Sequence, residues 1–350
     1  MKRRDFLKGA AVMTAGSMVP QMAMGAKKKT TKPEAPADVK PKYPNFTFGA
    51  NGKFRIMQFT DTHYITGDAR SERALKNVQS MIATERPDLV IHTGDIIFGK
   101  PAQQCLTEIL APISESGIPF AVALGNHDDE FGMSRLEVYD YIRQMKGCIN
   151  TPEKGIHGAS NDLITLSSAD GTVRWAFYLL DTGNRCKDIA IKTYEYLHFD
   201  QLAWYRGESL RLREGNGGKP VPSLAFMHIP LLEYTEALRD KSRYLRGNLG
   251  EEPCPSLVNS GMFVQMQEMG DIKALFSGHD HDDDYVCKWR DMFLAYGRYS
   301  GCDTVYNNLK PNGCRMIEIT EGASSIRTYV RLSDGKVEQD LTLPDSFHKD

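Results

Sequence analysis

The segment Leu89-Val90-Ile91-His92-Thr93-Gly94-Asp95 decides the fold of this 350-residue chain. A short run of apolar and β-branched residues that stops at Gly-Asp predicts a buried strand followed by a tight turn. The amphipathic segments 71–85 and 103–116, which predict helices, lie on either side of it. A buried strand between two helices is typical of an α/β domain.

The same alternation continues in both directions from this segment. We expect strands at 54–59, 89–93, 120–124, 223–227 and 274–276, a hairpin of 163–166 with 173–180, and several strands within 292–343. Further helices are expected at 134–145, 200–213 and 259–269. No repeat or Pro/Gly-rich linker divides residues 46–350. We therefore predict one α/β domain over 46–350, a four-layer sandwich of two packed mixed β-sheets flanked by helices.

The N-terminal residues have the layout of an export signal. Met1-Lys2-Arg3-Arg4-Asp5-Phe6-Leu7-Lys8 precedes an apolar run of roughly 15 residues, which is too short for a membrane-spanning helix. The paired arginines resemble a bacterial twin-arginine signal. We therefore predict a twin-arginine signal peptide over 1–26 and a flexible linker over 27–45. Export to the periplasm by the twin-arginine machinery, with no permanent membrane span, is the expected outcome.

Charge and cysteine usage exclude some classes of function. The chain has 43 basic and 45 acidic residues, so its composition indicates no surface that would hold nucleic acid electrostatically. The seven cysteines form no C-x-x-C pair, which argues against a zinc ribbon or a redox motif.

Five polar clusters follow five of the predicted strands, and all of them contain metal-binding side chains. The clusters are Asp61-Thr62-His63, Gly94-Asp95, Gly125-Asn126-His127-Asp128, His228 and Gly278-His279-Asp280-His281. Loops that follow the strands of an open α/β sheet converge at one edge, so we expect these clusters to meet. Asp95 offers two carboxylate oxygens that can bridge two cations. Two ions about 3.5 Å apart clamp a phosphate and generate a hydroxide nucleophile at neutral pH.

The order of these clusters resembles the hallmark of the calcineurin-like metallophosphoesterase superfamily, which is D-x-H, G-D, G-N-H-D, a lone His and G-H-x-H. The resemblance spans residues 54–285. It implies a first metal held by Asp61, His63, Asp95 and His281, and a second held by Asp95, Asn126, His228 and His279. It also implies that His127 is the acid that protonates the leaving oxygen and that Asp128 orients or tunes His127.

Around Asp95 the sequence looks closest to a purple-acid-phosphatase-like branch that includes proteins called Dcr2-like. Purple acid phosphatases carry a Tyr ligand three residues after this Asp, where the chain has Phe98, and they lack the His found here at His63. The resemblance therefore implies a site without a phenolate ligand to ferric iron. We expect no purple charge-transfer band.

The predicted reaction is hydrolysis of a phosphate ester, with phosphomonoesters favoured and a phosphorylated small molecule or phosphopeptide as substrate. We expect metal-bound hydroxide as the nucleophile and two divalent or trivalent ions of Fe, Mn or Zn as cofactors, because mixed nitrogen and oxygen cages accept these metals. The ligands do not separate this activity from a phosphodiesterase or a nucleotidase with the same cage. A noncatalytic metal-binding protein is a further alternative, although such descendants usually lose ligands that this chain retains.

Two other features leave their roles open. The acidic run Asp280, Asp282, Asp283, Asp284 fits a solvated loop or a calcium site, although calcium loops lack paired imidazoles. The long polar segments 184–196 and 233–255 are expected to shape the substrate pocket. Their arginines are candidate phosphate contacts, but ordinary surface charge explains each of them better: Arg185, Arg239, Arg243 and Arg246.

Overall fold

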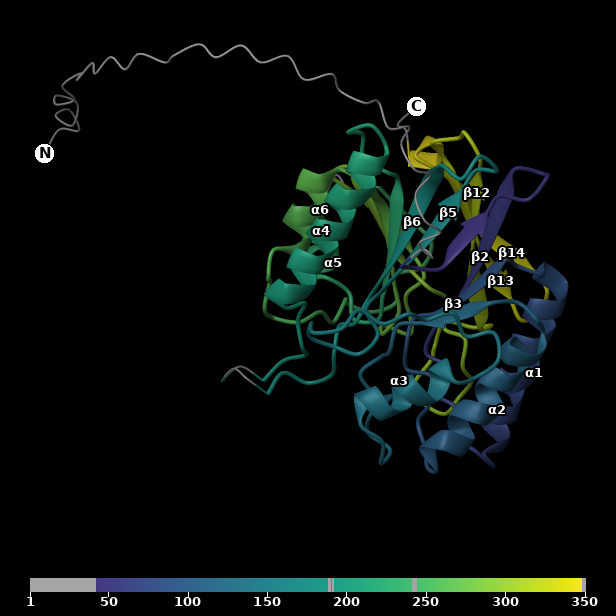
Figure 1. The fold of residues 1–350 in the computed structure, drawn as a ribbon. Coiled ribbons are helices and arrows are strands. Elements are labelled where there is room, and N and C mark those ends of the chain that lie inside the picture. The colour runs from purple at the N-terminus through teal and green to yellow at the C-terminus, as the bar shows by residue number, and fades with distance from the viewer. Residues whose placement is uncertain (1–41, 188–189, 191, 241–243, 348–350) are drawn as a thin grey trace, which may run out of the picture. The chain divides into compact units, whose positions relative to one another are not determined.

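The strands of the chain form two stacked β-sheets with helices on the outer faces (Figure 1). The computed structural model describes residues 42–187, 190, 192–240 and 244–347. The predicted signal peptide over 1–26, the predicted linker up to residue 41, and Arg243 lie outside the described residues. None of the helices in the described part is long and apolar enough to cross a membrane.

One sheet has six strands and contains the segment that begins at Leu89. Its order is β14 (Val337–Leu343), β13 (Ile326–Leu332), β12 (Gly313–Thr320), β2 (Lys53–Phe59), β3 (Leu89–His92) and β4 (Phe120–Val122). Strands β2, β3 and β4 are parallel, whereas β12, β13 and β14 form antiparallel pairs. The helices packed on its outer face are α1 (Ala69–Glu85), α2 (Ala102–Glu115) and α3 (Arg135–Arg143).

The second sheet has eight strands and is also mixed. Its order is β1 (Asn45–Thr47), β5 (Asp162–Ser167), β6 (Val173–Leu180), β7 (Ser223–Met227), β9 (Ile272–Ser277), β11 (Met292–Tyr296), β10 (Val286–Trp289) and β8 (Tyr244–Arg246). Strands β6, β7, β9 and β11 are parallel, and β5 forms the predicted hairpin with β6. The helices on this side are α4 (Phe199–Gly215), α5 (Leu232–Arg239) and α6 (Met262–Met269), and a 3-10 turn, η1 (Asp345–Phe347), follows β14.

Three hydrophobic clusters separate the four layers. Ile56 belongs to the cluster between the sheets and the next residue, Met57, to the cluster beneath α1–α3. This alternation follows from the strand period of two, which sends successive side chains to opposite faces. Because both faces of the central strands are covered, these strands are apolar on both sides, as the sequence of the Leu89 segment predicts. The predicted four-layer α/β sandwich is confirmed.

The structure corrects three boundaries. The predicted linker over 27–45 runs too far, because Tyr43 is buried in the core and β1 starts at Asn45. The predicted loop 233–255 contains most of α5 and all of β8. The helix predicted over 259–269 begins at Met262, because Gly261 at its N-cap adopts a left-handed backbone with φ of 87°.

Candidate metal centre

The five polar clusters lie at the carboxyl ends of β2, β3, β4, β7 and β9, where the two sheets meet. Backbone hydrogen bonds join the first two clusters, since Asp61 N donates to Gly94 O at 3.0 Å and His63 N donates to Asp95 O at 3.0 Å. Asp61, His63, Asp95 and His279 all have left-handed backbones, with φ of 55°, 42°, 50° and 82°. Non-glycine residues avoid this region at a cost of about 1–3 kcal/mol each, and such strain concentrates at functional sites.

Two glycines let these strand ends approach closely. A Cβ on Gly94 would lie 2.3 Å from the backbone nitrogen of Gly125, and Gly94 itself has φ of 89°. A Cβ on Gly278 would lie 1.9 Å from Thr60 Oγ1. The Gly-Asp and Gly-His motifs therefore place glycine directly before the predicted ligands Asp95 and His279 for a steric reason.

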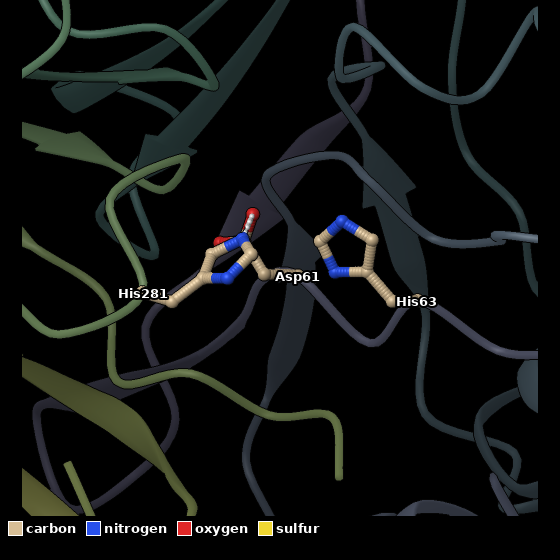
Figure 2. A group of neighbouring side chains, drawn as sticks. All are labelled: Asp61, His63 and His281. Atoms are coloured by element: carbon tan, nitrogen blue, oxygen red, sulfur yellow. Dashed lines mark ion pairs between the residues drawn. The ribbon is translucent and has the colours of Figure 1, made fainter. Parts of the chain in front are cut away.

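One half of the centre is formed by Asp61, His63 and His281, whose ligand atoms all lie within 4.8 Å of one another (Figure 2). His281 Nε2 lies 3.6 Å from Asp61 Oδ1. The other ring nitrogen of His281, Nδ1, donates to the carbonyl oxygen of Tyr306 at 2.9 Å. This bond leaves the Nε2 lone pair directed at the shared space, which is the arrangement that metal-binding imidazoles adopt.

Asp95 lies between the two halves. Its Oδ2 atom is 3.3 Å from Nε2 of His63 and 3.2 Å from Nε2 of His228. Its other oxygen, Oδ1, accepts a hydrogen bond from the backbone nitrogen of His127 at 2.8 Å. The position of Oδ2 between imidazoles of both halves is what a bridging carboxylate requires.

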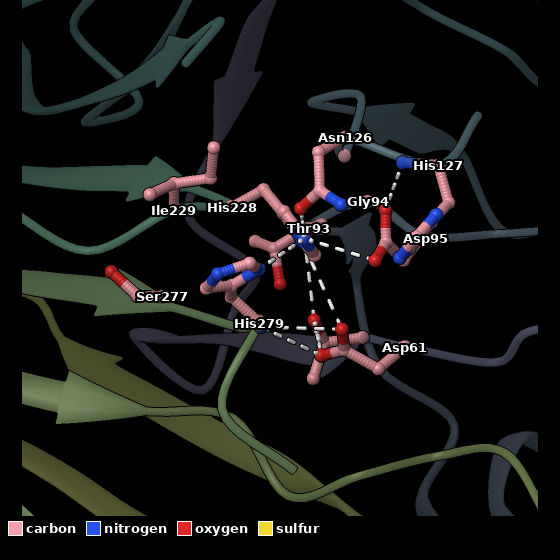
Figure 3. Close-up of polar contacts among 12 residues, drawn as sticks. Asp61, Thr93, Gly94, Asp95, Asn126, His127, His228, Ile229, Ser277 and His279 are labelled. Carbon is pink, nitrogen blue, oxygen red and sulfur yellow. Dashed lines mark hydrogen bonds and ion pairs between the residues drawn. The ribbon is translucent and has the colours of Figure 1, made fainter. Parts of the chain in front are cut away.

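The other half contains Asn126, His228 and His279 around the same carboxylate (Figure 3). His228 Nδ1 donates to Thr93 O at 2.8 Å, and its Nε2 lies 3.1 Å from Asn126 Oδ1 and 3.3 Å from His279 Nδ1. Three potential ligand atoms thus point toward one another.

The burial and the charges of the predicted ligands suit the binding of cations. None of the seven predicted ligands is more than 8% exposed, and neither ring nitrogen of His63 makes a hydrogen bond within the described residues. Burial lowers the pKa of His63, and lowers that of His279 to about 3, so both rings are neutral and can donate lone pairs. His228 and His281 differ, because nearby carboxylates outweigh burial: Asp95 raises the pKa of His228 to about 9, and Asp61 raises the pKa of His281. A buried anionic carboxylate surrounded by imidazoles is a group of ligands that can bind transition-metal ions.

His127 lies at the edge of this set and is paired differently from the prediction. Its Nδ1 lies 2.6 Å from Glu130 Oε2. Asp128, predicted to orient this ring, instead accepts backbone hydrogen bonds from Gly125, Asp95 and Ile96 at 2.7, 3.1 and 2.7 Å. Asp128 therefore holds the two ligand loops together, and Glu130 is the partner of His127.

Phe98 occupies the position at which purple acid phosphatases were expected to have a tyrosine. Its ring packs edge-on against His63, at 5.4 Å between centroids, and against His127, at 5.0 Å. An apolar ring therefore borders the site where a phenol would lie.

The carboxylates of the acidic run after His279 form hydrogen bonds with other groups of the protein. The run is therefore neither a solvated loop nor a calcium loop. Asp280 accepts from Tyr296 Oη at 2.6 Å, Asp282 accepts from Asn308 N at 2.6 Å, and Asp283 accepts from Gly250 N at 2.9 Å. All of these carboxylates are buried. They anchor the neighbouring loops around the predicted metal ligands.

Sequence reasoning missed the tyrosines that pack on the ligand rings. Tyr306 stacks on His281 with 4.4 Å between centroids, and Tyr194 meets His279 edge-on at 4.6 Å. His92 supports the backbone of the Gly-Asp motif, because its Nδ1 accepts a hydrogen bond from Gly94 N at 3.2 Å. No sequence signal marks the tyrosines, because they come from loops far from the motifs.

Comparison with known proteins places these features in a family. The sequence profile of the family described as calcineurin-like phosphoesterase matches residues 54–283. The protein named probable inactive purple acid phosphatase 28 of Arabidopsis thaliana is 30% identical over 329 residues, which cover 82% of each chain. Phosphatase DCR2 of Saccharomyces cerevisiae is 25% identical over 81% of this chain and 54% of its own length.

Solved structures show the same fold. A dimetal phosphatase from Danio rerio superposes with a TM-score of 0.58 at 14% identity, covering 83% of this chain and 98% of its own. The purple acid phosphatase PPD1 from yellow lupin superposes with a TM-score of 0.54 at 14% identity, covering 88% of this chain and 56% of its own.

Proposed function

Because the chain belongs to the calcineurin-like phosphoesterase family, we propose that it hydrolyses phosphate esters, with phosphomonoesters favoured, at a dinuclear metal centre. The observation that carries this proposal is the position of Asp95 Oδ2, within 3.3 Å of imidazole nitrogens from both halves of the site. Substrates would be phosphorylated small molecules or phosphopeptides.

The residues divide into two overlapping ligand sets in this proposal. Asp61, His63, Asp95 and His281 would hold one ion, and Asp95, Asn126, His228 and His279 the other. Two such ions, of Fe, Mn or Zn, bind phosphate oxygens and lower the pKa of water to near neutrality.

His127 is the proposed proton donor to the leaving oxygen. With its Nδ1 bonded to Glu130, the ring is held in one orientation and its Nε2 is the atom that can give a proton. The ring is partly exposed, so a substrate can reach it. Asp128 contributes indirectly, since its two carboxylate oxygens fix the loops that carry Asp95 and Asn126.

Two alternatives use the same cage. A phosphodiesterase or nucleotidase would need only different surrounding loops. A noncatalytic metal-binding protein is favoured by one observation, which is that three similar plant proteins are named probable inactive purple acid phosphatases. Against it, this chain retains all the predicted ligands together with His127.

An assay of turnover by metal-reconstituted protein distinguishes the proposed function from the two alternatives. Chelated apoprotein would receive Mn, Fe or Zn and be assayed with phosphomonoesters and with bis(p-nitrophenyl) phosphate. Metal-dependent hydrolysis of monoesters in preference to the diester supports the proposal. Preference for the diester supports the first alternative, and metal binding without any turnover supports the second.

Export is a separate proposal that rests on Arg3, Arg4 and the apolar run after them. We propose a periplasmic location reached through the twin-arginine machinery. Residues 1–45 fused to a folded reporter should deliver it to the periplasm, and the double substitution Arg3→Lys, Arg4→Lys should retain it in the cytoplasm. Export that persists in the double variant would contradict the proposal.

A further inference from the structure

A hollow of about 200 Å³ lies between the segment that follows His127 and the segment that follows β6. Its walls include Asp129, two residues after His127, and Asn184 and Arg185 from the segment after β6. Asn184 Nδ2 donates to Asp129 Oδ1 at 2.8 Å, which joins the two segments. The hollow therefore borders the segment that carries His127, the group proposed to protonate the leaving oxygen.

Tyr194 places Arg185 one aromatic ring away from a metal-binding residue. The guanidinium carbon of Arg185 lies 4.1 Å from the centroid of the Tyr194 ring, and that ring meets His279 edge-on. The backbones of Arg185 and Tyr194 pair as a β-bridge. The backbone pairing and the cation–π contact together hold Arg185 close to Tyr194 and therefore near the site.

The acidic groups in the wall of the hollow are already paired. Arg135 Nη2 lies 2.5 Å from Asp181 Oδ1 and Arg135 Nη1 lies 3.8 Å from Asp129 Oδ1, and Glu195 Oε1 lies 3.0 Å from His198 Nε2. Because these carboxylates already have partners, they do not neutralise any further cation in the hollow.

Arg185 and Lys187 are the cations without such partners. Both line the hollow, both are exposed, and neither lies within 4.0 Å of a carboxylate in the described part of the chain. Two unpaired positive charges beside a phosphate site would attract an anion. The guanidinium fork suits a carboxylate or phosphate bound through two parallel hydrogen bonds.

From this arrangement we infer that the hollow receives the group esterified to the phosphate, and that Arg185 selects small leaving groups bearing a second negative charge. This inference rests on the proposed function and names its substrate class, such as a bisphosphate or a phosphorylated carboxylic acid. The volume suits a small organic group, since pockets for drug-sized ligands are about 300–1,000 Å³.

Binding of non-hydrolysable analogues to metal-loaded protein tests this inference without turnover. Calorimetry would compare phenylphosphonate with its 3- and 4-carboxy derivatives. We expect a carboxy derivative to bind about tenfold more tightly than phenylphosphonate, equivalent to roughly 1.4 kcal/mol. In Arg185→Gln this preference should disappear while phenylphosphonate binding stays unchanged.

Arg327→Gln is the control, because the Arg327 guanidinium also lies over a tyrosine ring, 4.8 Å from the centroid of Tyr329, but it pairs with Asp340 and does not line the hollow. It should keep the preference. Equal binding of all analogues by the unaltered protein, a preference that survives in Arg185→Gln, or no binding at all would overturn the inference. Hydrolysis of phenyl phosphate, measured in parallel, reports on the proposed function alone, so either idea can fail while the other stands.

Discussion

Glu130 Oε2 lies 2.6 Å from Nδ1 of His127 and so fixes the orientation of the proposed proton donor. General acid catalysis contributes about 10²–10⁴-fold for a poor leaving group and little for a good one. His127→Ala should therefore lower turnover of an alkyl phosphate by at least about 10²-fold and that of p-nitrophenyl phosphate much less. Glu130→Gln should show the same pattern with a smaller loss. Equal losses for both substrates would contradict the proton-donor role.

Asp95→Asn should impair both halves of the metal centre. An amide presents one oxygen and no charge, whereas Oδ2 of Asp95 faces both His63 and His228. We expect elemental analysis to find less than one tightly bound ion per chain and turnover to fall by more than about 10²-fold. Asp170→Asn, in the exposed turn between β5 and β6, is the control and should bind metal normally. Two retained ions in the Asp95 variant would refute the bridging role.

Asp128→Ala should destabilise the metal-free protein. The substitution removes the acceptor for buried amides of Gly125, Asp95 and Ile96, and each unsatisfied group costs about 1–3 kcal/mol. We expect the free energy of unfolding in urea, with chelator present, to fall by about 3–5 kcal/mol. Asp291→Ala, in the exposed turn between β10 and β11, should cost under about 1 kcal/mol. Similar losses in the two variants would show that Asp128 does not hold the loops.

The buried carboxyl of Asp162 should make the free energy of unfolding depend on pH. Burial raises its pKa from 3.8 to about 7 in the folded protein. Between about pH 4 and 7 the unfolded chain has released this proton and the folded protein still holds it. Rising pH therefore lowers stability across this window, by up to about 1.4 kcal/mol per pH unit, and adds nothing further above it.

The variant Asp162→Asn isolates this effect, because it removes one ionisation and leaves the other acidic groups in place. With chelator present, its unfolding free energy should decline less between pH 4.5 and 7 than that of the unaltered protein. Parallel profiles would show that the Asp162 carboxyl ionises normally in the folded state.

The presence of Phe98 leads to a prediction about the visible absorbance of the iron-loaded protein. Its ring borders His63 and His127 and has no oxygen to bind ferric iron. The iron-loaded protein should lack the strong visible charge-transfer band of a tyrosinate complex. Such a band would mean that another tyrosine binds the metal.

The sequence predicts the fold and the ligand clusters well because both follow from local patterns. Apolar runs that end in Gly-Asp or Gly-His identify the strands, and parallel strands bring their ends to one edge. The predicted partner of His127 was wrong: the family resemblance implied Asp128, whereas the turn points Asp128 into the protein and Glu130 lies beside His127. Helix α5 was missed although Tyr234 and Ala237 have the i, i+3 spacing of a buried helix face.

The packing around the ligands is the part that the sequence does not reveal. Tyr194 and Tyr306 contact ligand rings from segments 85 and 25 residues away, a separation that follows from 279 − 194 and 306 − 281. Such contacts depend on the tertiary arrangement of loops, and no local periodicity encodes them. The pairing of Arg185 with Tyr194 belongs to the same class.

Anomalous diffraction from crystals of the metal-loaded protein tests the central claim most directly. We expect two peaks about 3.5 Å apart, each about 2.0–2.2 Å from an oxygen of Asp95. A single peak, or two peaks of which only one contacts Asp95, would contradict it.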